Sequence, residues 1–322
     1  MAKLSGAFTK GTDFTIILTP GLTKELLQGV PAGLPDSKLL DYWATLSSCL
    51  TGLDLNVDRS DLSLLQPAYL KELTRLTWLS FYEEADDIDD ADQVLWPHYA
   101  FEFPELKHLD FSNLRAGNVD MQCPQLCLLS IQDCIMGKLH IQASLKDLCL
   151  SHSTYVLLHE GFPMSNLSGL TCLRLVGNDD FNSEAAIFRR LPLMTALQDL
   201  HLGINLCSLP ATLPKSLRNL TLTFSSDGAW DSSVIPLMQQ LPRVESIRIS
   251  IYSQDGGSIG DKSLDHDLRP FLAMSSLRLL QFGKSFRWNE SASQLWKAST
   301  LRQLGELEAE VVKLGKKLQL RY

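Results

Sequence analysis

Two signatures of membrane and secreted proteins are missing from the sequence. No apolar run approaches the roughly 18 consecutive residues that a membrane-spanning helix needs. The first residues, Met1 to Gly6, contain no apolar core of the kind that a secretory signal peptide carries. We therefore expect no membrane association, and we predict a cytoplasmic location.

Motifs that carry metal or catalytic chemistry are also lacking. The 7 cysteines include no Cys-x-x-Cys pair, whereas tetrahedral zinc needs ligands that converge on one point. The glycine-rich run from Gly256 to Lys262 lacks the Gly-Lys-Ser/Thr ending of a phosphate-binding loop. No Ser or Cys lies in a glycine elbow that would present a nucleophile. The sequence thus predicts a non-enzymatic protein with no cofactor and no metal.

One short segment accounts for most of the net charge of -8. Residues 83–92 contain seven acidic residues and no basic one, so the rest of the chain is nearly neutral. A near-neutral surface lacks the broad basic footprint that nucleic acid requires. We therefore expect no nucleic-acid binding. We interpret the acidic segment as a solvated loop, and the alternative is a segment that steers a basic partner.

The sequence does contain one repeated pattern, Leu-x-x-Leu-x-Leu, whose apolar positions also accept Ile, Val or Phe. Its ten copies have these middle positions: Leu53, Leu79, Leu109, Leu129, Leu148, Leu173, Leu200, Leu220, Ile247 and Leu280. Successive middle positions are 19 to 33 residues apart, which brackets the roughly 20 to 29 residues of a leucine-rich repeat. Alternating apolar residues predict one short strand in each copy.

On this pattern the chain resembles the leucine-rich-repeat superfamily over residues 50–290. The ninth position of most copies holds a small polar residue or Cys, namely Asp58, Cys134, Ser153, Asn178, Asn205, Ser225 and Ser285. The resemblance implies an α/β solenoid, a horseshoe of about ten repeats with a parallel β-sheet on its concave face and helices and loops on its convex face. Ninth-position side chains are expected to bind the buried backbone where the chain turns. Glu84, Leu114 and Tyr252 depart from the pattern, and we expect irregular turns there.

Two further features agree with this register. Pro104, Pro124 and Pro242 each lie five residues before a middle apolar residue, and Pro marks the entry to a strand because it cannot donate to a sheet. Between strands, residues 185–191 and 234–241 have the apolar spacing of short helices, which we expect on the convex side.

The two ends of the chain fall outside the repeats. Residues 1–49, with an extra strand expected at residues 14–18, are predicted to cap the first repeat. In residues 291–322 the apolar side chains are spaced by three and four, at Leu304, Leu307, Val311, Leu314 and Leu318, which predicts a helix. That helix either caps the last repeat of a monomer or self-associates as a short coiled coil through residues 301–318.

Side chains between the buried positions of each strand are expected to point out from the concave face. Aromatic and charged residues there predict a protein-binding site made of Trp78, Tyr82, Asp110, Arg174, His201, Arg218, Arg248 and Arg278. We therefore predict a non-enzymatic scaffold or adaptor whose partner is a protein. Similar members of the superfamily include cytoskeletal and axonemal proteins, and the resemblance implies that kind of location.

Two alternatives stay open for the function. Residues 34–43 are similar to an F-box, which would make the chain the substrate-recognition subunit of a ubiquitin ligase. The repeats would otherwise serve as the recognition arm of a larger enzyme.

Overall fold

The computed structural model describes residues 14–18, 50–57, 73–83, 96–152, 167–176, 188–204, 212–225, 234–253, 268–286 and 298–321. They divide into two compact units, residues 1–170 and residues 171–322, and each unit is described by itself. In these ranges, no helix has the length and apolar character needed to cross a membrane.

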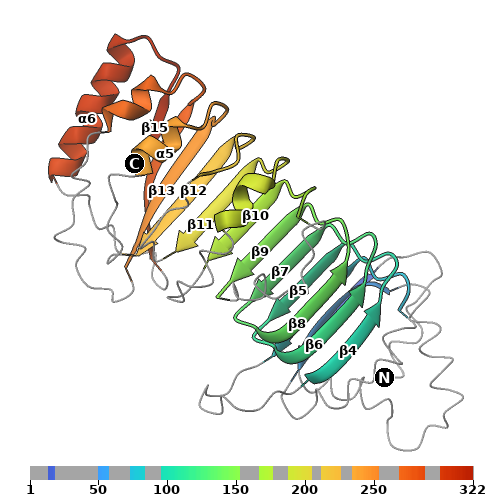
Figure 1. Ribbon diagram of the computed structural model, residues 1–322. Coiled ribbons are helices and arrows are strands. Elements are labelled where there is room, and N and C mark those ends of the chain that lie inside the picture. Colours follow the sequence, from blue (N-terminus) through green and yellow to red (C-terminus); the bar gives the residue numbers. More distant parts are fainter. Residues whose placement is uncertain are drawn as a thin grey trace, which may run out of the picture. The chain divides into compact units, whose positions relative to one another are not determined.

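The first unit is built around a parallel sheet of short strands (Figure 1). The strands pair in the order β1 (Phe14–Leu18), β2 (Leu50–Val57), β3 (Trp78–Glu83), β5 (His108–Ser112), β7 (Leu128–Gln132) and β9 (Asp147–Ser151). The register does not drift, because Leu53, Leu79, Leu109, Leu129 and Leu148 lie directly opposite one another. Each repeat in the described ranges therefore contributes one strand to this sheet, as the pattern predicts, and the strand expected at residues 14–18 is present as β1.

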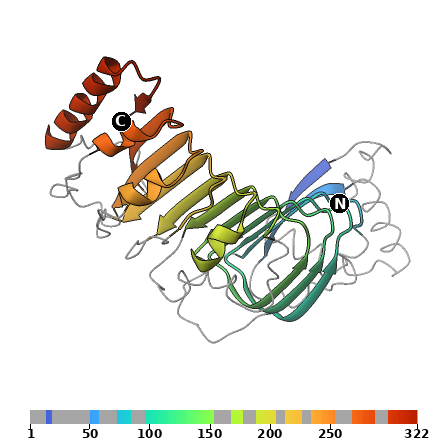
Figure 2. The same ribbon diagram turned by 45° about the horizontal axis from the view of Figure 1, so that its top comes forward.

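A second parallel sheet covers part of the core of the first unit. It contains β4 (Trp96–Glu102), β6 (Arg115–Gln122) and β8 (Ile135–Gln142), and Figure 2 shows these strands opposite those of the main sheet. The helices and loops expected on this side are therefore wrong for residues 96–142. The repeats that contain β6 and β8 are 20 and 19 residues long, which leaves little chain for a helix. Alternate residues of β6 and β8, including Val119, Met121, Leu139 and Ile141, are buried instead, with the two-residue period of strands.

The second unit continues the one-strand repeat. Its strands pair in parallel in the order β10 (Cys172–Val176), β11 (Asp199–Ile204), β12 (Asn219–Ser225), β13 (Ser246–Ser253), β14 (Leu279–Phe286) and β15 (Gln319–Arg321). Between them lie η4 (Leu191–Leu193), α5 (Val234–Gln239) and η5 (Arg269–Ala273). The short helix expected over residues 234–241 is confirmed. Of the helix expected over 185–191, residues 188–190 form one helical turn that leads into η4.

The three apolar positions of the pattern form the core of both units. Every described member is buried, including Leu126, Leu129 and Ile131. A fourth buried position comes three residues before the first, as at Phe103 and Cys123. It begins a tight turn, since the N–H of Leu126 donates to the carbonyl of Cys123 at 3.0 Å. Pro124 occupies the second position of that turn, where the fixed φ of proline is favoured, so proline marks the turn into the strand.

The turns that follow β5, β7 and β9 use a left-handed residue. Asn113, Asp133 and His152 have φ values of 59°, 51° and 51°, and these residue types adopt that conformation more readily than other non-glycine residues. Leu114 follows Asn113 in the first of these turns and is buried. The irregular turn expected at Leu114 is therefore wrong, because an apolar residue at this position is accommodated in the core.

Cys134, at the ninth position of its repeat, makes the backbone contacts expected there. Its Sγ accepts from the N–H of Leu114 at 3.4 Å and donates to the carbonyl of Gln132 at 3.1 Å. Burial raises the pKa of the Cys134 thiol to about 12, so the group stays protonated at neutral pH. Because Leu114 is the ninth residue of the preceding repeat, the first bond links one turn to the next.

The ninth position has a different role in the second unit. Ser225 and Ser285 lie inside β12 and β14, and both are in register with Tyr252 of β13. The turn expected at Ser285 and the irregular turn expected at Tyr252 are therefore wrong, because β14 and β13 each extend one residue past this position. Ser225 is the last residue of β12, and the turn expected after it lies outside the described residues. Asp58, Glu84, Ser153, Asn178 and Asn205 lie outside the described residues.

The helix α6 (Ala298–Lys313) and the strand β15 follow the last repeat. Leu304, Leu307 and Val311 are buried, so the apolar stripe of α6 packs within the unit, as a cap would. The N–H of Gln319 donates to the carbonyl of Arg278 at 2.7 Å, which adds β15 to the sheet. Self-association through residues 301–318 stays a prediction.

The helix α6 ends in a left-handed glycine. Gly315 has a φ of 62°, its N–H donates to the carbonyl of Val312 at 3.0 Å, and the N–H of Lys316 donates to that of Val311 at 3.1 Å. This pair of bonds is the Schellman arrangement that satisfies the last carbonyls of a helix. The exposed Leu314 therefore lies beyond the helix rather than on its apolar stripe.

Gly315→Ala is expected to lower the free energy of unfolding of the second unit by about 1 kcal/mol. No atom lies within 4 Å of a Cβ built at Gly315 or at Gly305, so the loss comes from the left-handed backbone alone. The matched control, Gly305→Ala inside α6, should stabilise by up to about 1 kcal/mol. Chemical denaturation measures both changes, and effects of the same sign would contradict the assignment.

Candidate functional site

On the strands that contain the repeated pattern, the third, fifth and seventh positions of successive repeats lie side by side and form columns. These columns make up one face of the sheet in each unit, which we call the column face. The fifth positions make the central column. In the first unit it contains Asp54, Ser80, Asp110, Ser130 and Cys149. In the second unit it contains Arg174, His201, Thr221, Arg248 and Gln281. Parallel pairing holds neighbouring members about 4.8 Å apart, measured between strands.

The column face of the first unit carries a hydrogen-bonded polar group around Asp110. The hydroxyl of Ser112 donates to Asp110 Oδ1 at 3.5 Å, and Ser130 bonds the same side chain. Burial raises the pKa of Asp110 above its ordinary value, against the opposing effect of the two serine bonds. Asp110 is therefore engaged within the protein, which favours a role in the sheet over direct contact with a partner.

The two aromatic residues predicted for the site lie on β3 of the first unit. Tyr82 is 39% exposed, whereas Trp78 is half-buried. Between them in the sequence, Phe81 turns inward and stacks on Phe111 with ring centroids 5.6 Å apart. The alternation of strand side chains thus places Trp78 and Tyr82 on the column face and Phe81 in the core.

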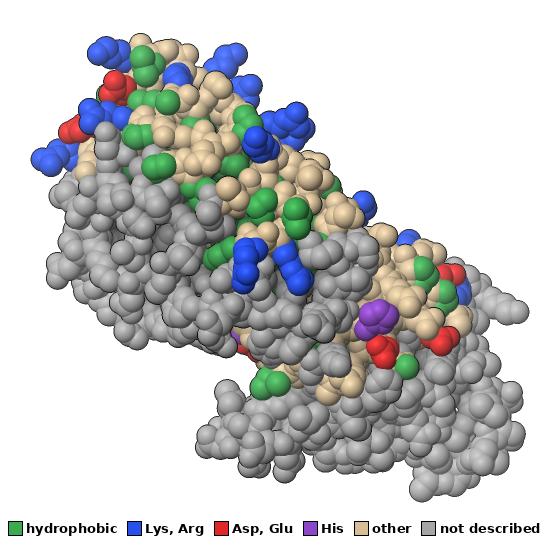
Figure 3. Space-filling view, in the orientation of Figure 1, with side chains coloured by type: hydrophobic (Ala, Val, Ile, Leu, Met, Phe, Trp, Pro, Cys, Tyr) green, Lys and Arg blue, Asp and Glu red, His purple; other side chains and the backbone are tan. Residues whose placement is uncertain are grey.

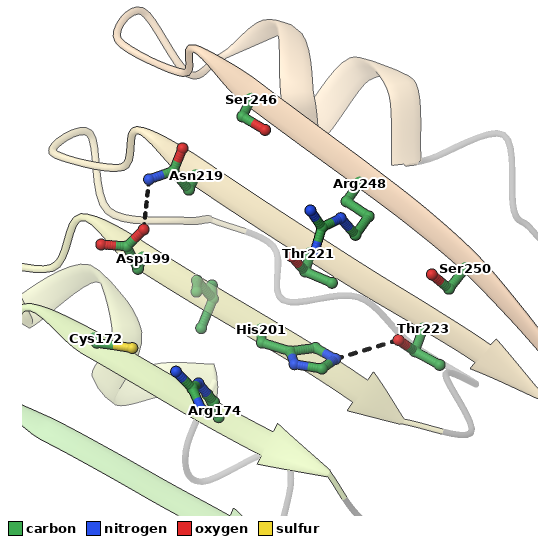
Figure 4. Close-up of a pocket in the computed structure, with 11 residues that line it drawn as sticks. Cys172, Arg174, Asp199, His201, Asn219, Thr221, Thr223, Ser246, Arg248 and Ser250 are labelled. Carbon is green, nitrogen blue, oxygen red and sulfur yellow. Dashed lines mark hydrogen bonds between the residues drawn. The ribbon is translucent and has the colours of Figure 1, made fainter. Parts of the chain in front are cut away.

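The column face of the second unit contains a hollow of about 560 Å³ (Figure 4). Third, fifth and seventh positions of β10 to β13 line it, namely Cys172, Arg174, Asp199, His201, Asn219, Thr221, Thr223, Ser246, Arg248 and Ser250, together with Leu200. The lining is mostly polar. It therefore differs from the largely apolar, enclosed cavities that hold small organic ligands.

Hydrogen bonds between neighbouring strands fix several of these side chains. Asn219 Nδ2 donates to Asp199 Oδ1, and His201 Nε2 lies 3.2 Å from the hydroxyl of Thr223 (Figure 4). Outside the hollow, Gln281 Oε1 accepts from Arg248 Nε at 3.2 Å. The carboxylate of Asp199 is thus bound to an amide of the protein, and the guanidinium plane of Arg248 is oriented by its neighbour.

The electrostatics of the hollow centre on His201. Burial is the main cause that lowers the pKa of His201 below its ordinary value, and the positive charges of Arg174 and Arg248 lower it further. At neutral pH the imidazole is therefore uncharged. The charged groups of the lining are then the two guanidinium groups and the hydrogen-bonded carboxylate of Asp199.

Gly203 leaves space beside His201. It is the seventh residue of its repeat, and a Cβ built there would lie 3.3 Å from Val176 Cγ2 and 3.7 Å from His201 Nε2. A side chain at this position would crowd Val176 and would make ordinary contact with His201. The sequence prediction did not include Gly203, Asp199, Asn219 or Thr223, although they occupy the same third and seventh positions as the predicted Trp78 and Tyr82.

The structure brings together only part of the predicted site. Arg174, His201 and Arg248 line one hollow. Arg218 and Arg278 are exposed at the second position of their repeats and do not line it, and Arg218 Nη1 pairs with Glu245 Oε1 at 3.4 Å. The backbone explains their place, because the carbonyl of Arg218 accepts the N–H groups of Glu245 and Ser246 where β13 begins. Trp78, Tyr82 and Asp110 belong to the other unit.

In the described ranges, the structure shows neither a metal-binding cluster nor a reactive thiolate at Cys123 or Cys134. The described residues contain no group of three or more His, Cys, Asp and Glu side chains that could hold a metal ion. Burial raises the pKa of Cys123 to about 11, and Cys134 is raised further, so neither is a reactive thiolate at neutral pH. Both sulfur atoms lie in the core.

Comparison with known proteins assigns no family to the chain. No protein-family model matches it, and no curated protein matches it.

Proposed function

We propose that the chain is a leucine-rich-repeat solenoid of the horseshoe type, and that it acts as a non-enzymatic scaffold or adaptor that binds another protein on its column face. The observation that supports this most is the constant register of the strands. Equivalent residues from distant parts of the sequence lie side by side, so isolated polar residues become continuous columns. Paired strands hold this surface in place before a partner arrives, which reduces the ordering cost of binding.

Residue types on the column face agree with a protein partner. Tyr82, Arg174 and Arg248 are exposed, and Tyr and Arg are enriched among residues that contribute most to protein–protein affinity. The hollow between β10 and β13 is lined mostly by polar side chains, which can hydrogen-bond to side chains of a partner (Figure 4).

A catalytic role is less well supported by the same hollow. The contact between His201 and the hydroxyl of Thr223 resembles the start of a nucleophile–base pair, but such a pair also needs a third group that orients the imidazole. The carboxylate of Asp199 bonds to Asn219 instead. We therefore propose binding rather than catalysis.

We propose a cytoplasmic location, with association to cytoskeletal or axonemal structures as the more specific form. The F-box-like segment at residues 34–43 lies outside the described residues. The ubiquitin-ligase and larger-enzyme alternatives therefore stay predictions.

The proposed function predicts that Trp78→Ala, Arg174→Gln and Arg248→Gln, introduced together, abolish capture of the main partner. Loss of one aromatic anchor and two charges from the column face should weaken binding by 100-fold or more, at about 1 kcal/mol or more for each residue. Crosslinking with mass spectrometry identifies the partner of the unaltered chain, and quantitative capture of that partner by each variant measures the loss.

A second triple variant provides the matched control. Leu193→Ser, His140→Gln and Lys313→Gln change exposed residues on η4, β8 and α6, away from the column face. This variant should retain capture, and both variants should unfold near the temperature of the unaltered chain. Full capture by the column-face variant, or equal losses in the two variants, would overturn the proposed function.

A further inference from the structure

We propose that the hollow of the second unit binds an extended acidic segment of the partner protein, with two carboxylates about four residues apart that contact Arg174 and Arg248 on either side of His201. This inference rests on the proposed function, because it specifies the chemistry of the partner at that site.

The spacing of the two arginines sets the length of the segment. Arg174 lies on β10 and Arg248 on β13, with β11 and β12 paired between them. Three strand spacings amount to about 14 Å, and four residues of extended chain advance about 13 Å. An extended segment that crosses the strands can therefore present one carboxylate to each guanidinium group, whereas one small anion has no such reach.

Both guanidinium groups have donors for a carboxylate. Arg248 uses Nε for Gln281 at 3.2 Å, and this bond orients the two terminal nitrogens of the same planar group. A guanidinium carries five N–H donors, so Arg174 can bind a carboxylate in addition to its contacts within the protein. Both side chains are exposed on the column face.

The charge of the hollow favours a negative ligand. The groups that face His201 are Arg174 and Cys172 from β10, Asp199 from its own strand, and Arg248 from β13, while β12 contributes the uncharged Asn219, Thr221 and Thr223. Burial is the main cause that lowers the pKa of His201, and the positive charges of Arg174 and Arg248 lower it further, so these two charges act at the imidazole. The one carboxylate, Asp199, is bound to Asn219. Complementary charge supplies specificity and a faster encounter with an acidic segment.

The rest of the lining suits the backbone between the two carboxylates. Thr221, Thr223, Ser246 and Ser250 carry hydroxyl groups that can donate to or accept from an extended chain. Gly203 keeps the space beside His201 clear. The space-filling view shows Lys and Arg side chains gathered, with some acidic ones among them, at the end of the second unit that contains α6 (Figure 3).

Binding of an acidic segment should depend on pH through His201. Carboxylates beside the imidazole stabilise its charged form, so the pKa of His201 is higher in the complex than in the free protein. Affinity should therefore rise as the pH falls through the value in the complex, and should level off below the value in the free protein.

The test uses the full chain and synthetic peptides of about nine residues, each with Gly, Ser and Thr around two Glu residues four positions apart. Calorimetry measures affinity, and NMR follows the His201 ring during pH titration. Replacing either Glu by Gln should weaken binding about fivefold, as should Arg174→Gln or Arg248→Gln in the protein. Arg243→Gln and Arg302→Gln, at exposed positions outside the hollow, should change affinity less than twofold. His201→Gln should keep binding but flatten its pH dependence.

Several results would overturn the inference. Equal binding of the Glu and Gln peptides would show that the hollow does not select an acidic ligand. Unchanged affinity of both Arg174→Gln and Arg248→Gln would show the same. Equal shifts of the His201 pKa with inorganic phosphate alone, or with a peptide carrying one Glu, would remove the two-carboxylate arrangement. The proposed function is tested separately. If the column-face variant loses its partner while no acidic peptide binds, only this inference fails, and if the peptide binds while partner capture is unaffected, the proposed function fails.

Discussion

Replacing Phe111 by Ala is expected to lower the free energy of unfolding of the first unit by about 3–5 kcal/mol. Phe111 is 1% exposed and its ring stacks on Phe81. The substitution removes apolar area from the core and leaves a cavity between two repeats. Because β5 is paired with a strand on each side, the backbone cannot move in to fill this cavity. Chemical denaturation, followed by tryptophan fluorescence, measures the loss.

The location of the effect is as informative as its size. In a repeat array each repeat contacts chiefly its neighbours, so local stability falls most in the strands next to the substitution. Hydrogen exchange should become faster in β3, β5 and β7, and much less so in α6 of the second unit. Leu193→Ala changes a side chain that is 63% exposed and should cost less than about 0.5 kcal/mol. A loss below about 1 kcal/mol for Phe111→Ala, or a uniform rise in exchange over both units, would contradict this account of the core.

Cys134→Ala is expected to destabilise the first unit by about 1–3 kcal/mol, whereas Cys134→Ser should retain most of the stability. Alanine leaves the buried N–H of Leu114 without the acceptor that Sγ supplies. Serine can accept from that N–H and donate to the carbonyl of Gln132, as the thiol does. Denaturation of both variants gives the difference in the free energy of unfolding.

Two comparisons make the result specific to the hydrogen bonds. Cys127, at the second position of the same repeat, is partly exposed and donates to the carbonyl of Lys107 at 3.3 Å. Cys127→Ala should cost less than about 1 kcal/mol, because water can replace the thiol there. If Cys134→Ser proved as destabilising as Cys134→Ala, Cys134 would act as an apolar core residue and the hydrogen-bonded link between turns would be wrong.

The positions of the strands were predictable from the sequence because the same apolar pattern recurs in ten copies. Each copy supplies three apolar residues whose spacing fits an extended segment with one buried face. The observed strands include the middle residues of the pattern, such as Leu109, Leu129 and Leu220. The sheet of β4, β6 and β8 was harder to predict from the sequence. The segments of β6 and β8 also alternate, but each has only two or three large apolar residues, and the family resemblance pointed to helices instead.

The candidate site was predictable only as a set of columns. The sequence placed Arg174, His201 and Arg248 at equivalent positions, and the register of β10 to β13 confirms that they share a column. It could not show that Asp110 is engaged by two serines or that Arg218 pairs with Glu245. Those contacts join residues in different strands, and their geometry depends on side-chain rotamers that the spacing of apolar residues does not determine.

The sequence by itself determined short strands with one buried face, because apolar residues alternate within every copy of the pattern, and the resemblance to leucine-rich repeats implied that these strands pair in parallel. Only the tertiary structure decided what covers that core, where the strands end and which polar residues meet. Which apolar side chains are buried depends on their spacing along each strand, and this spacing can be read within one short segment of sequence. Hydrogen bonds such as those of Cys134 and Asn219 depend on distances between atoms from different repeats, and only the folded chain sets these distances.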